Sequence, residues 1–322
     1  MHLYTFSWLV LSLLLVSCSG NSNTTTQNTT TQNIPDTGMY VSALYSEVSI
    51  KKYLNITYST RSNEGGTQYT SEITKAAELN TTTLALNLDV AVPPNATASK
   101  AQPLLVLIHG GGFTTGGKED TYIQAISYAR AGYVVASINY RLTPNNQQTA
   151  ALRLKAIQQA SDDAMNAIRF LKSNAATYYI DTTRVATIGF SAGGAISLIN
   201  AVEFDTLTNT VSDFVGITSK VDAALSTGAT LVENGYDSSS FLHYSATDTP
   251  VLLFHANPSD SVTAATWNGN VVPTQALINN SGNVCEIVAQ ADMTHTVDLS
   301  LGGSYWSSLK PFLWINLRLS SL

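Results

Sequence analysis

Runs of consecutive apolar residues, each about the length of one strand, recur along this chain and alternate with stretches of helical spacing. "PLLVLIHG" (103–110) and "YVVASINY" (133–140) are apolar almost throughout. Such runs are typical of strands that are buried on both faces of a parallel sheet, because helices cover each face. We therefore predict an α/β fold with a mostly parallel central sheet and helices on both faces. The other expected strands are 53–60, 83–92, 184–190, 250–256 and 284–289, and the expected helices are 119–132, 162–178 and 192–204.

The stretch "GFSAGG" (189–194) lies where an expected strand passes into an expected helix. Its first five residues match the pattern G-x-S-x-G, in which a tight turn holds a serine exposed above the sheet. The glycines relieve clashes that a Cβ would cause in such a turn, and the first N–H groups of the helix are unpaired nearby. Ser191 is therefore a candidate nucleophile, and a glycine-rich turn with an incidental serine is the alternative.

A serine hydroxyl becomes a good nucleophile when a histidine, itself oriented by a carboxylate, takes its proton. His295 lies in the polar loop "QADMTHTVD" (290–298), after the last expected strand, and is the candidate base. His255 ends an expected strand, where a structural role is plausible, and His243 has no neighbouring pattern.

Asp260 is the candidate for the orienting carboxylate. It lies in "HANPSDSVT" (255–263), just after an expected strand, and ligands in parallel sheets bind at the carboxyl ends of the strands. The chain order Ser191, Asp260, His295 is the order expected after a serine turn of this kind. Asp222, in "SKVDAAL" (219–225), is the second candidate, and Asp260 could instead cap a turn.

The stretch "HGGGFTTGG" (109–117) follows a central-looking strand, and three successive glycines let its backbone approach a ligand closely. The N–H groups of Gly111 and Gly112, with that of Ala192, could stabilise an oxyanion. A phosphate-binding loop is disfavoured because the GK[ST] ending is missing. No group of His, Cys or Asp residues has metal-site spacing, so we expect no metal.

The N-terminus has the features of an export signal. "WLVLSLLLVSC" (8–18) is an apolar run too short to cross a bilayer as a mature helix, and "LVSC" resembles the bacterial lipobox, whose cysteine is lipidated. Residues 19–33 carry no charge and few apolar side chains, which favours a flexible tether. Ordinary secretion is the alternative, since "MHLYTFS" lacks the usual Lys or Arg. We expect a signal peptide at 1–17, a lipidated Cys18 with its tether at 18–35, and one domain at 36–322.

The composition fits an exported protein without a nucleic-acid partner. Only 12% of the residues are charged, and the net charge of −6 leaves no basic stripe for phosphates. Of the two cysteines, Cys18 lies in the leader. Cys285 is then without a disulfide partner and is expected to be a small core residue.

Taken together, the motifs make the chain resemble the α/β-hydrolase superfamily, and more narrowly the hormone-sensitive-lipase-like and the feruloyl- and acetyl-xylan-esterase-like carboxylesterases. The resemblance covers roughly residues 80–300. It implies Ser191 as nucleophile, His295 as base, Asp260 as acid, and Gly111, Gly112 and Ala192 as the oxyanion hole. The motifs that carry it are "HGGGF" (109–113), "NYRLTP" (139–144), "DDAMNAIRFLKSNA" (162–175), "GFSAGG" (189–194) and "FHANPSD" (254–260).

Two further features of the chain refine this expectation. Relatives of the lipase-like branch carry an acidic residue before the nucleophile, where this chain has Phe190, and this favours the feruloyl- or acetyl-xylan-esterase-like branch. No helical cap domain is evident before residue 80, so an open, shallow site is expected.

The expected activity is therefore cofactor-free hydrolysis of a small-molecule ester, with short-chain or carbohydrate-linked substrates. Two other functions stay open: a surface-tethered binding protein on a hydrolase fold, and a peptidase of the prolyl-oligopeptidase type.

Overall fold

The computed structural model describes residues 33–62, 83–143, 149–205, 213–232 and 241–322. From Ile34 onward these residues belong to one compact unit, Ile34–Leu322. The predicted signal peptide, Cys18 and most of the predicted tether lie outside the described residues. In the part of the chain that is described, no helix is long and apolar enough to cross a membrane.

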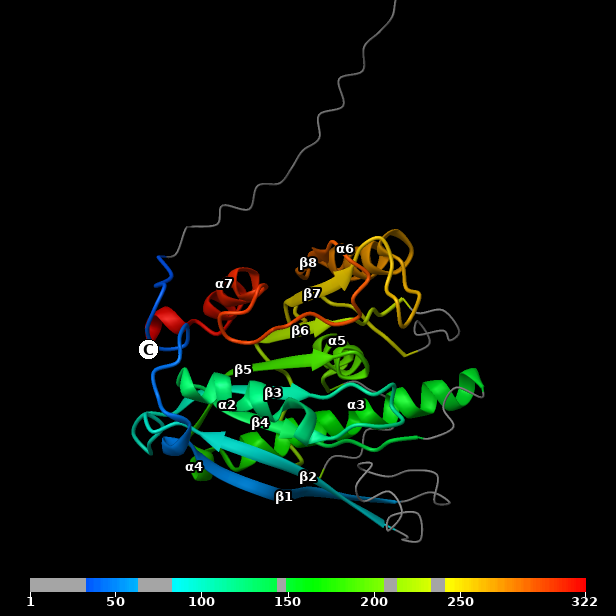
Figure 1. Cartoon of the computed structure of the whole chain (residues 1–322). Helices are drawn as coiled ribbons and strands as arrows, with labels where there is room; N and C mark the ends of the chain where they lie inside the picture. The colour runs from blue at the N-terminus through cyan, green and yellow to red at the C-terminus, as the bar shows by residue number, and fades with distance from the viewer. Residues whose placement is uncertain (1–32, 63–82, 144–148, 206–212, 233–240) are drawn as a thin grey trace, which may run out of the picture. The chain divides into compact units, whose positions relative to one another are not determined.

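The described residues form one eight-stranded sheet in the order β1-β2-β4-β3-β5-β6-β7-β8, which can be followed from bottom to top in Figure 1. β2 runs antiparallel to both of its neighbours, and the pairs from β4 through β8 are all parallel. The strands are β1 (Lys51–Ser62), β2 (Thr83–Val92), β3 (Gln102–Ile108), β4 (Val134–Ile138), β5 (Ile180–Phe190), β6 (Ala223–Thr227), β7 (Val251–Ala256) and β8 (Cys285–Gln290).

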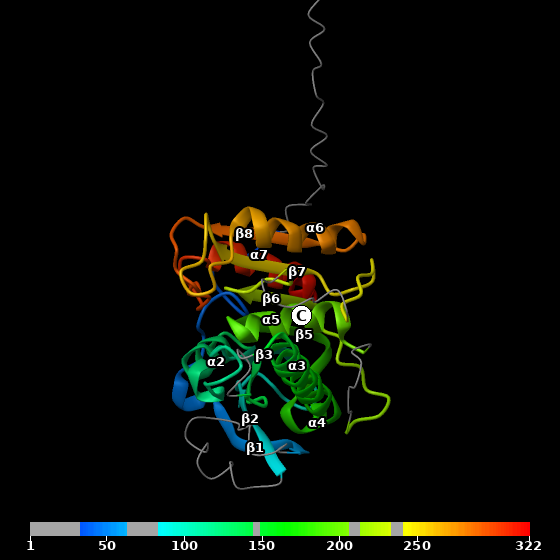
Figure 2. The ribbon, with the colours of Figure 1, turned by 90° about the vertical axis from the view of Figure 1, so that its right-hand side faces the viewer.

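Helices cover both faces of the sheet, as Figure 2 shows for α2 and α3 on either side of β3. Residues of α2 (Tyr122–Arg130) and α7 (Trp306–Asn316) share one apolar core with the sheet, and residues of α3 (Ala150–Ser173) and α5 (Ala192–Glu203) share another. The remaining helical segments are α4 (Ala175–Tyr178), α6 (Val272–Asn280), and the short turns η1 (Glu47–Ser49), η3 (Lys118–Thr121), η5 (Trp267–Val271) and η6 (Leu319–Ser321).

The side chains of β3 show why the central strands are continuously apolar. Leu104, Val106 and Ile108 pack into the core with α3 and α5, whereas Leu105 and Leu107 pack into the core with α2 and α7. All five are fully buried. Since successive side chains of a strand point to opposite faces, a strand covered on both sides must be apolar at every position. The predicted mostly parallel sheet with helices on both faces is confirmed.

Several elements differ from the sequence prediction. α3 begins at Ala150, twelve residues before the expected start, because Thr149 caps it by accepting a hydrogen bond from the N–H of Leu152 at 3.1 Å. β6 was not among the expected strands, since it is five residues long and ends in Ser-Thr. α7 was not expected either, because Pro311 inside it resembles a helix breaker. Cys285 is buried in the core, as predicted.

Candidate active site

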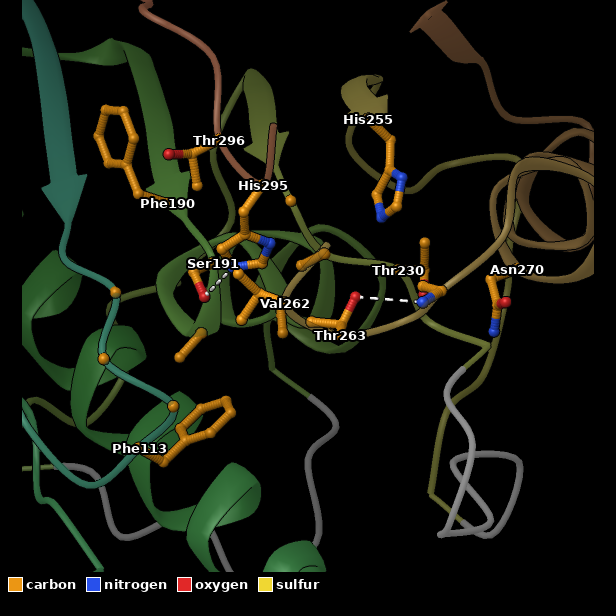
Figure 3. A pocket seen from close by; sticks show the side chains of 18 of the residues that line it. Phe113, Phe190, Ser191, Thr230, His255, Val262, Thr263, Asn270, His295 and Thr296 are labelled. Atoms are coloured by element: carbon orange, nitrogen blue, oxygen red, sulfur yellow. Dashed lines mark hydrogen bonds between the residues drawn. The ribbon is translucent and has the colours of Figure 1, made fainter. Parts of the chain in front are cut away.

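Three side chains from distant parts of the sequence form one chain of hydrogen bonds at the carboxyl ends of the strands. His295 Nε2 lies 2.7 Å from Ser191 Oγ, and His295 Nδ1 lies 2.6 Å from Asp260 Oδ2. A carboxylate only accepts hydrogen bonds, so Nδ1 carries the proton and Nε2 is free to accept the proton of the serine. Figure 3 shows His295 pointing toward Ser191, with a dashed line for this contact.

Ser191 lies at a strained turn between β5 and α5. Its φ of 54° and ψ of −119° are unusual for a residue with a Cβ, and such strain persists only where the surroundings enforce it. Its N–H donates to the Thr227 carbonyl of β6 at 2.8 Å. A Cβ on Gly193 would lie 2.1 Å from the Ile108 carbonyl oxygen, so only glycine lets α5 begin this close to β3. The turn thus places Ser191 beside the first N–H groups of α5, including that of Ala192.

Asp260 is buried behind His295 and organises its own loop. Its Oδ1 accepts hydrogen bonds from the N–H groups of Val262 and Thr263, both at 2.8 Å. Its side chain is fully buried, whereas that of His295 is 16% exposed. Burial raises the pKa of Asp260, but hydrogen bonds from His295 and from the two backbone N–H groups outweigh this effect, so its pKa lies below the ordinary value. The carboxyl group is therefore ionised at neutral pH.

In the glycine loop after β3, local hydrogen bonds hold the carbonyl groups of Gly110 and Gly111 in place. The Gly110 carbonyl accepts from His109 Nδ1 at 2.7 Å, and the Gly111 carbonyl accepts from the N–H groups of Thr114 and Thr115 at 3.0 and 3.1 Å. In a trans peptide the N–H points opposite to the carbonyl. The N–H groups of Gly111 and Gly112 are thereby turned away from these carbonyls.

His109 has a structural place in this loop. Its ring stacks on Tyr140 with centroids 4.2 Å apart and planes 10° apart, and the Tyr140 hydroxyl donates to the His109 carbonyl at 2.9 Å. Burial lowers the pKa of His109 to about 4, so the ring is neutral at pH 7.

The alternative acid, Asp222, lies at the amino ends of the parallel strands, opposite to the carboxyl ends where Ser191, Asp260 and His295 meet. It directly precedes β6, and its carboxylate accepts from the Val185 N–H at 3.0 Å and from Arg318 at 3.2 Å. The triad candidates lie where β5, β7 and β8 end. The structure therefore brings Asp260, and not Asp222, to His295.

The other two described histidines lie apart from the hydrogen-bond chain. His255 is buried at the end of β7, with Nδ1 3.2 Å from the Ala256 carbonyl and Nε2 4.0 Å from Asp260 Oδ2. Burial lowers its pKa. His243 contacts Glu203 Oε1 through Nδ1 at 3.0 Å.

Two residues at the end of β6 position His295 and were missed from the sequence. A Cβ on Gly228 would lie 2.3 Å from the His295 carbonyl oxygen, and its φ is +73°. Thr227 Oγ1 accepts from the Val297 N–H at 2.9 Å. The sequence signal was the "STG" at 226–228, which could have been recognised had β6 been predicted.

These groups border a cleft of about 890 Å³. Ser191, His295, Gly111, Gly112 and Ala192 line it, and Asp260 lies behind. In Figure 3, Phe113 and Phe190 lie toward one side of the cleft, and Thr230, His255 and Asn270 toward the other. The described residues include no group of three or more His, Cys, Asp or Glu able to hold a metal ion.

Comparison with known proteins identifies the same fold. The model of the BD-FAE family matches residues 88–232. Thermogutta terrifontis esterase 2 phosphorylated by paraoxon superposes with a TM-score of 0.58 over 85% of this chain and 93% of that one, at 16% identity. A truncated carbohydrate esterase from gut microbiota gives 0.58 over 88% of this chain and all of that one, at 17% identity. The α/β-hydrolase fold that the resemblance implied is confirmed.

Curated relatives match a shorter segment. Carboxylesterase NlhH of Mycobacterium tuberculosis is 36% identical over 100 residues, which is 31% of this chain and 28% of the relative. Ethyl acetate hydrolase of Pseudomonas putida is 33% identical over 110 residues, 34% of this chain and 32% of the relative. Endo-1,4-beta-xylanase B of Butyrivibrio fibrisolvens is 24% identical over 156 residues, 48% and 22% of the two chains. The chain thus spans about a third or less of these relatives.

Proposed function

We propose that this chain is a serine carboxylic-ester hydrolase that acts through an acyl-enzyme. The observation that carries the proposal is the hydrogen-bond chain from Ser191 through His295 to Asp260, with heavy-atom distances of 2.7 and 2.6 Å. Contacts of this length are within the reach required of a nucleophile, its base and the group that orients the base.

In the first half of the reaction, Ser191 Oγ attacks the ester carbonyl carbon while His295 Nε2 takes the hydroxyl proton. The ionised Asp260 stabilises the imidazolium that forms. Collapse of the tetrahedral intermediate breaks the bond to the leaving oxygen, which takes the proton from His295 and departs as the alcohol. Water, activated by the same histidine, then attacks the acyl-serine and releases the acid.

The negative charge of the tetrahedral oxygen develops beside the N–H groups of Gly111, Gly112 and Ala192. Each such donor contributes about 2.7–4 kcal/mol of transition-state stabilisation in serine hydrolases. The donors belong to a strained loop and to a helix N-terminus, so little reorganisation is needed during the reaction. No cofactor takes part in these steps.

We propose short-chain or carbohydrate-linked esters as substrates. The apolar ring of Phe190 and polar groups of Thr230 and Asn270 line different parts of the cleft, which suits an ester with one apolar and one hydroxylated part. The names of two similar proteins, an ethyl acetate hydrolase and a carbohydrate esterase, point to the same range of esters.

Hydrolysis of p-nitrophenyl acetate by the wild type and by Ser191→Ala tests the proposal. We expect turnover that Ser191→Ala reduces by at least about a thousandfold, because only the serine forms the acyl-enzyme. Equal, negligible turnover in both proteins, across acetyl, butyryl, octanoyl and feruloyl esters, would contradict it and favour a binding protein. A higher kcat/KM on proline amides than on esters would favour a peptidase.

We also propose that the chain is exported and anchored to a bacterial membrane through a lipid on Cys18. The apolar run and the lipobox-like "LVSC" support this proposal. Metabolic labelling with a fatty-acid analogue tests it in the wild type and in Cys18→Ser. Incorporation that Cys18→Ser abolishes is expected, and unlabelled wild type in the culture medium would instead indicate ordinary secretion.

A further inference from the structure

We infer that Arg153, on the first turns of α3, is a positioning residue that holds the glycine loop 110–113 in the conformation needed to bind the oxyanion. Arg153 lines the cleft, although it lies 41 residues beyond Gly112 in the sequence. This role rests on the proposed ester hydrolysis and adds a residue that the sequence motifs do not include.

The loop needs such support because three successive residues adopt left-handed backbone conformations. φ is +106° at Gly111, +62° at Gly112 and +63° at Phe113. Glycine tolerates this region, but a residue with a Cβ is destabilised there by about 1–2 kcal/mol. Phe113 therefore keeps this conformation only if its surroundings compensate for the strain.

Arg153 contacts both of the last two strained residues. Its Nη1 donates to the Gly112 carbonyl at 3.2 Å, and its guanidinium carbon lies 4.8 Å from the centre of the Phe113 ring. The ring is fully buried, and the Phe113 carbonyl accepts from the Thr143 N–H at 2.7 Å. Without Arg153, the peptide between Gly112 and Phe113 loses a donor that helps to hold its orientation.

With Arg153 included, the carbonyls of Gly110, Gly111 and Gly112 each have a donor. Three consecutive peptide planes are thereby fixed, which sets the direction of the N–H groups between them. A rotation of the last plane changes ψ of Gly112 and frees the loop to relax toward ordinary backbone conformations. Donors that are misaligned with the oxyanion no longer stabilise the transition state.

Arginine suits both contacts better than lysine does. A planar guanidinium can stack on an aromatic ring while an N–H at its edge donates to a carbonyl. An ammonium group can donate to the Gly112 carbonyl, but it lacks the planar surface for Phe113. The variants Arg153→Met and Arg153→Lys therefore separate the two contacts from simple filling of space.

The test measures kcat and KM on p-nitrophenyl acetate, and the affinity for a trifluoromethyl ketone that forms a hemiketal with the serine. Kinetic values are normalised to active sites titrated with paraoxon. Arg130→Met is the matched control, because Arg130 also donates to a backbone carbonyl, that of Tyr45 at 2.9 Å, on the far helix α2.

For Arg153→Met we expect kcat and ketone affinity to fall together by about tenfold or more, with KM within twofold, because a transition-state interaction is lost. Arg153→Lys recovers part of kcat, and Arg130→Met leaves both values unchanged. An unchanged kcat, or a raised KM with unchanged kcat, would overturn the inference.

Amide hydrogen exchange in residues 110–113 separates this inference from the proposed function. Faster exchange in Arg153→Met than in the wild type is expected. If the wild type hydrolyses esters no faster than Ser191→Ala, the proposed function fails, and unchanged exchange in Arg153→Met then overturns the positioning role as well. An active wild type with an equally active Arg153→Met overturns the positioning role alone.

Discussion

Replacing Asp260 by Asn changes one carboxylate oxygen to an NH₂ group. His295 then faces a hydrogen-bond donor where it faced an acceptor. The Asn carbonyl can keep the two N–H groups of Val262 and Thr263, so the loop retains its shape. The amide NH₂ then stands where Oδ2 accepted the Nδ1 proton of His295 at 2.6 Å. Two donors now face each other in a buried position.

The expected loss follows from that mismatch. A buried donor without a partner costs about 1–3 kcal/mol, so two facing donors cost about 2–6 kcal/mol. His295 avoids this cost by moving its proton to Nε2, which faces Ser191 and can then no longer accept a proton. Recovery of the productive tautomer therefore adds up to about 2–6 kcal/mol to the barrier, which corresponds to a kcat lower by about 30-fold to 10⁴-fold.

The assay compares Asp260→Asn with Asp222→Asn in p-nitrophenyl acetate hydrolysis at pH 7, with thermal unfolding as the check on folding. Asp222→Asn should keep kcat within about twofold, because its contacts lie at the opposite end of the sheet. A folded Asp260→Asn that keeps more than a tenth of wild-type kcat would refute the reasoning, and so would an equal loss in both variants.

Two further predictions concern the glycine turn and the buried histidine. Gly193→Ala should lose more than about 2 kcal/mol of unfolding free energy and most of its activity, because the new Cβ would lie 2.1 Å from the Ile108 carbonyl oxygen. The control is Gly302→Ala, where φ is +76° but no atom lies within 4 Å of the new Cβ; it should lose only about 1 kcal/mol and keep its kcat. Urea unfolding measures the stability of both variants. The pKa of His109, about 4 in the fold against 6.5 when unfolded, means that the unfolded state binds more protons between these values, so stability falls as the pH falls. His109 therefore lowers the free energy of unfolding by about 2 kcal/mol as the pH falls from 7 to 4.5. Urea unfolding of His109→Gln should show a smaller pH dependence than that of the wild type. An identical pH dependence in both proteins would contradict the prediction.

The sheet and the three site side chains were predictable because each depends on a local pattern. A strand buried on both faces must be apolar along its length, as β3 is, and a serine between glycines at a strand-to-helix boundary needs no knowledge of distant contacts. The position of Asp260 after β7 then follows from the rule that parallel strands present their carboxyl ends together.

Contacts across the fold were not predictable in the same way. The first turns of α3 (150–161) were not included in the expected helix, and nothing near Arg153 in the sequence indicates that its partner is the Gly112 carbonyl. The need for glycine at position 228 likewise follows only from the tertiary structure, in which the loop of His295 passes directly over Gly228. Such close approaches are tertiary properties, set by how the loops after neighbouring strands meet.

The contrast between the serine turn and the loop after Asp260 has a consequence for how this protein can diverge. At the turn, the backbone of Gly193 packs directly against the backbone of Ile108, so a larger residue in place of this glycine displaces Ser191 Oγ. In the loop of Asp260, Val262 lines the cleft with 69% of its surface exposed, and its backbone N–H, rather than its side chain, makes the contact with the carboxylate. Natural variation can therefore alter which esters fit by changing that exposed rim, while the chemistry beneath it is inherited intact.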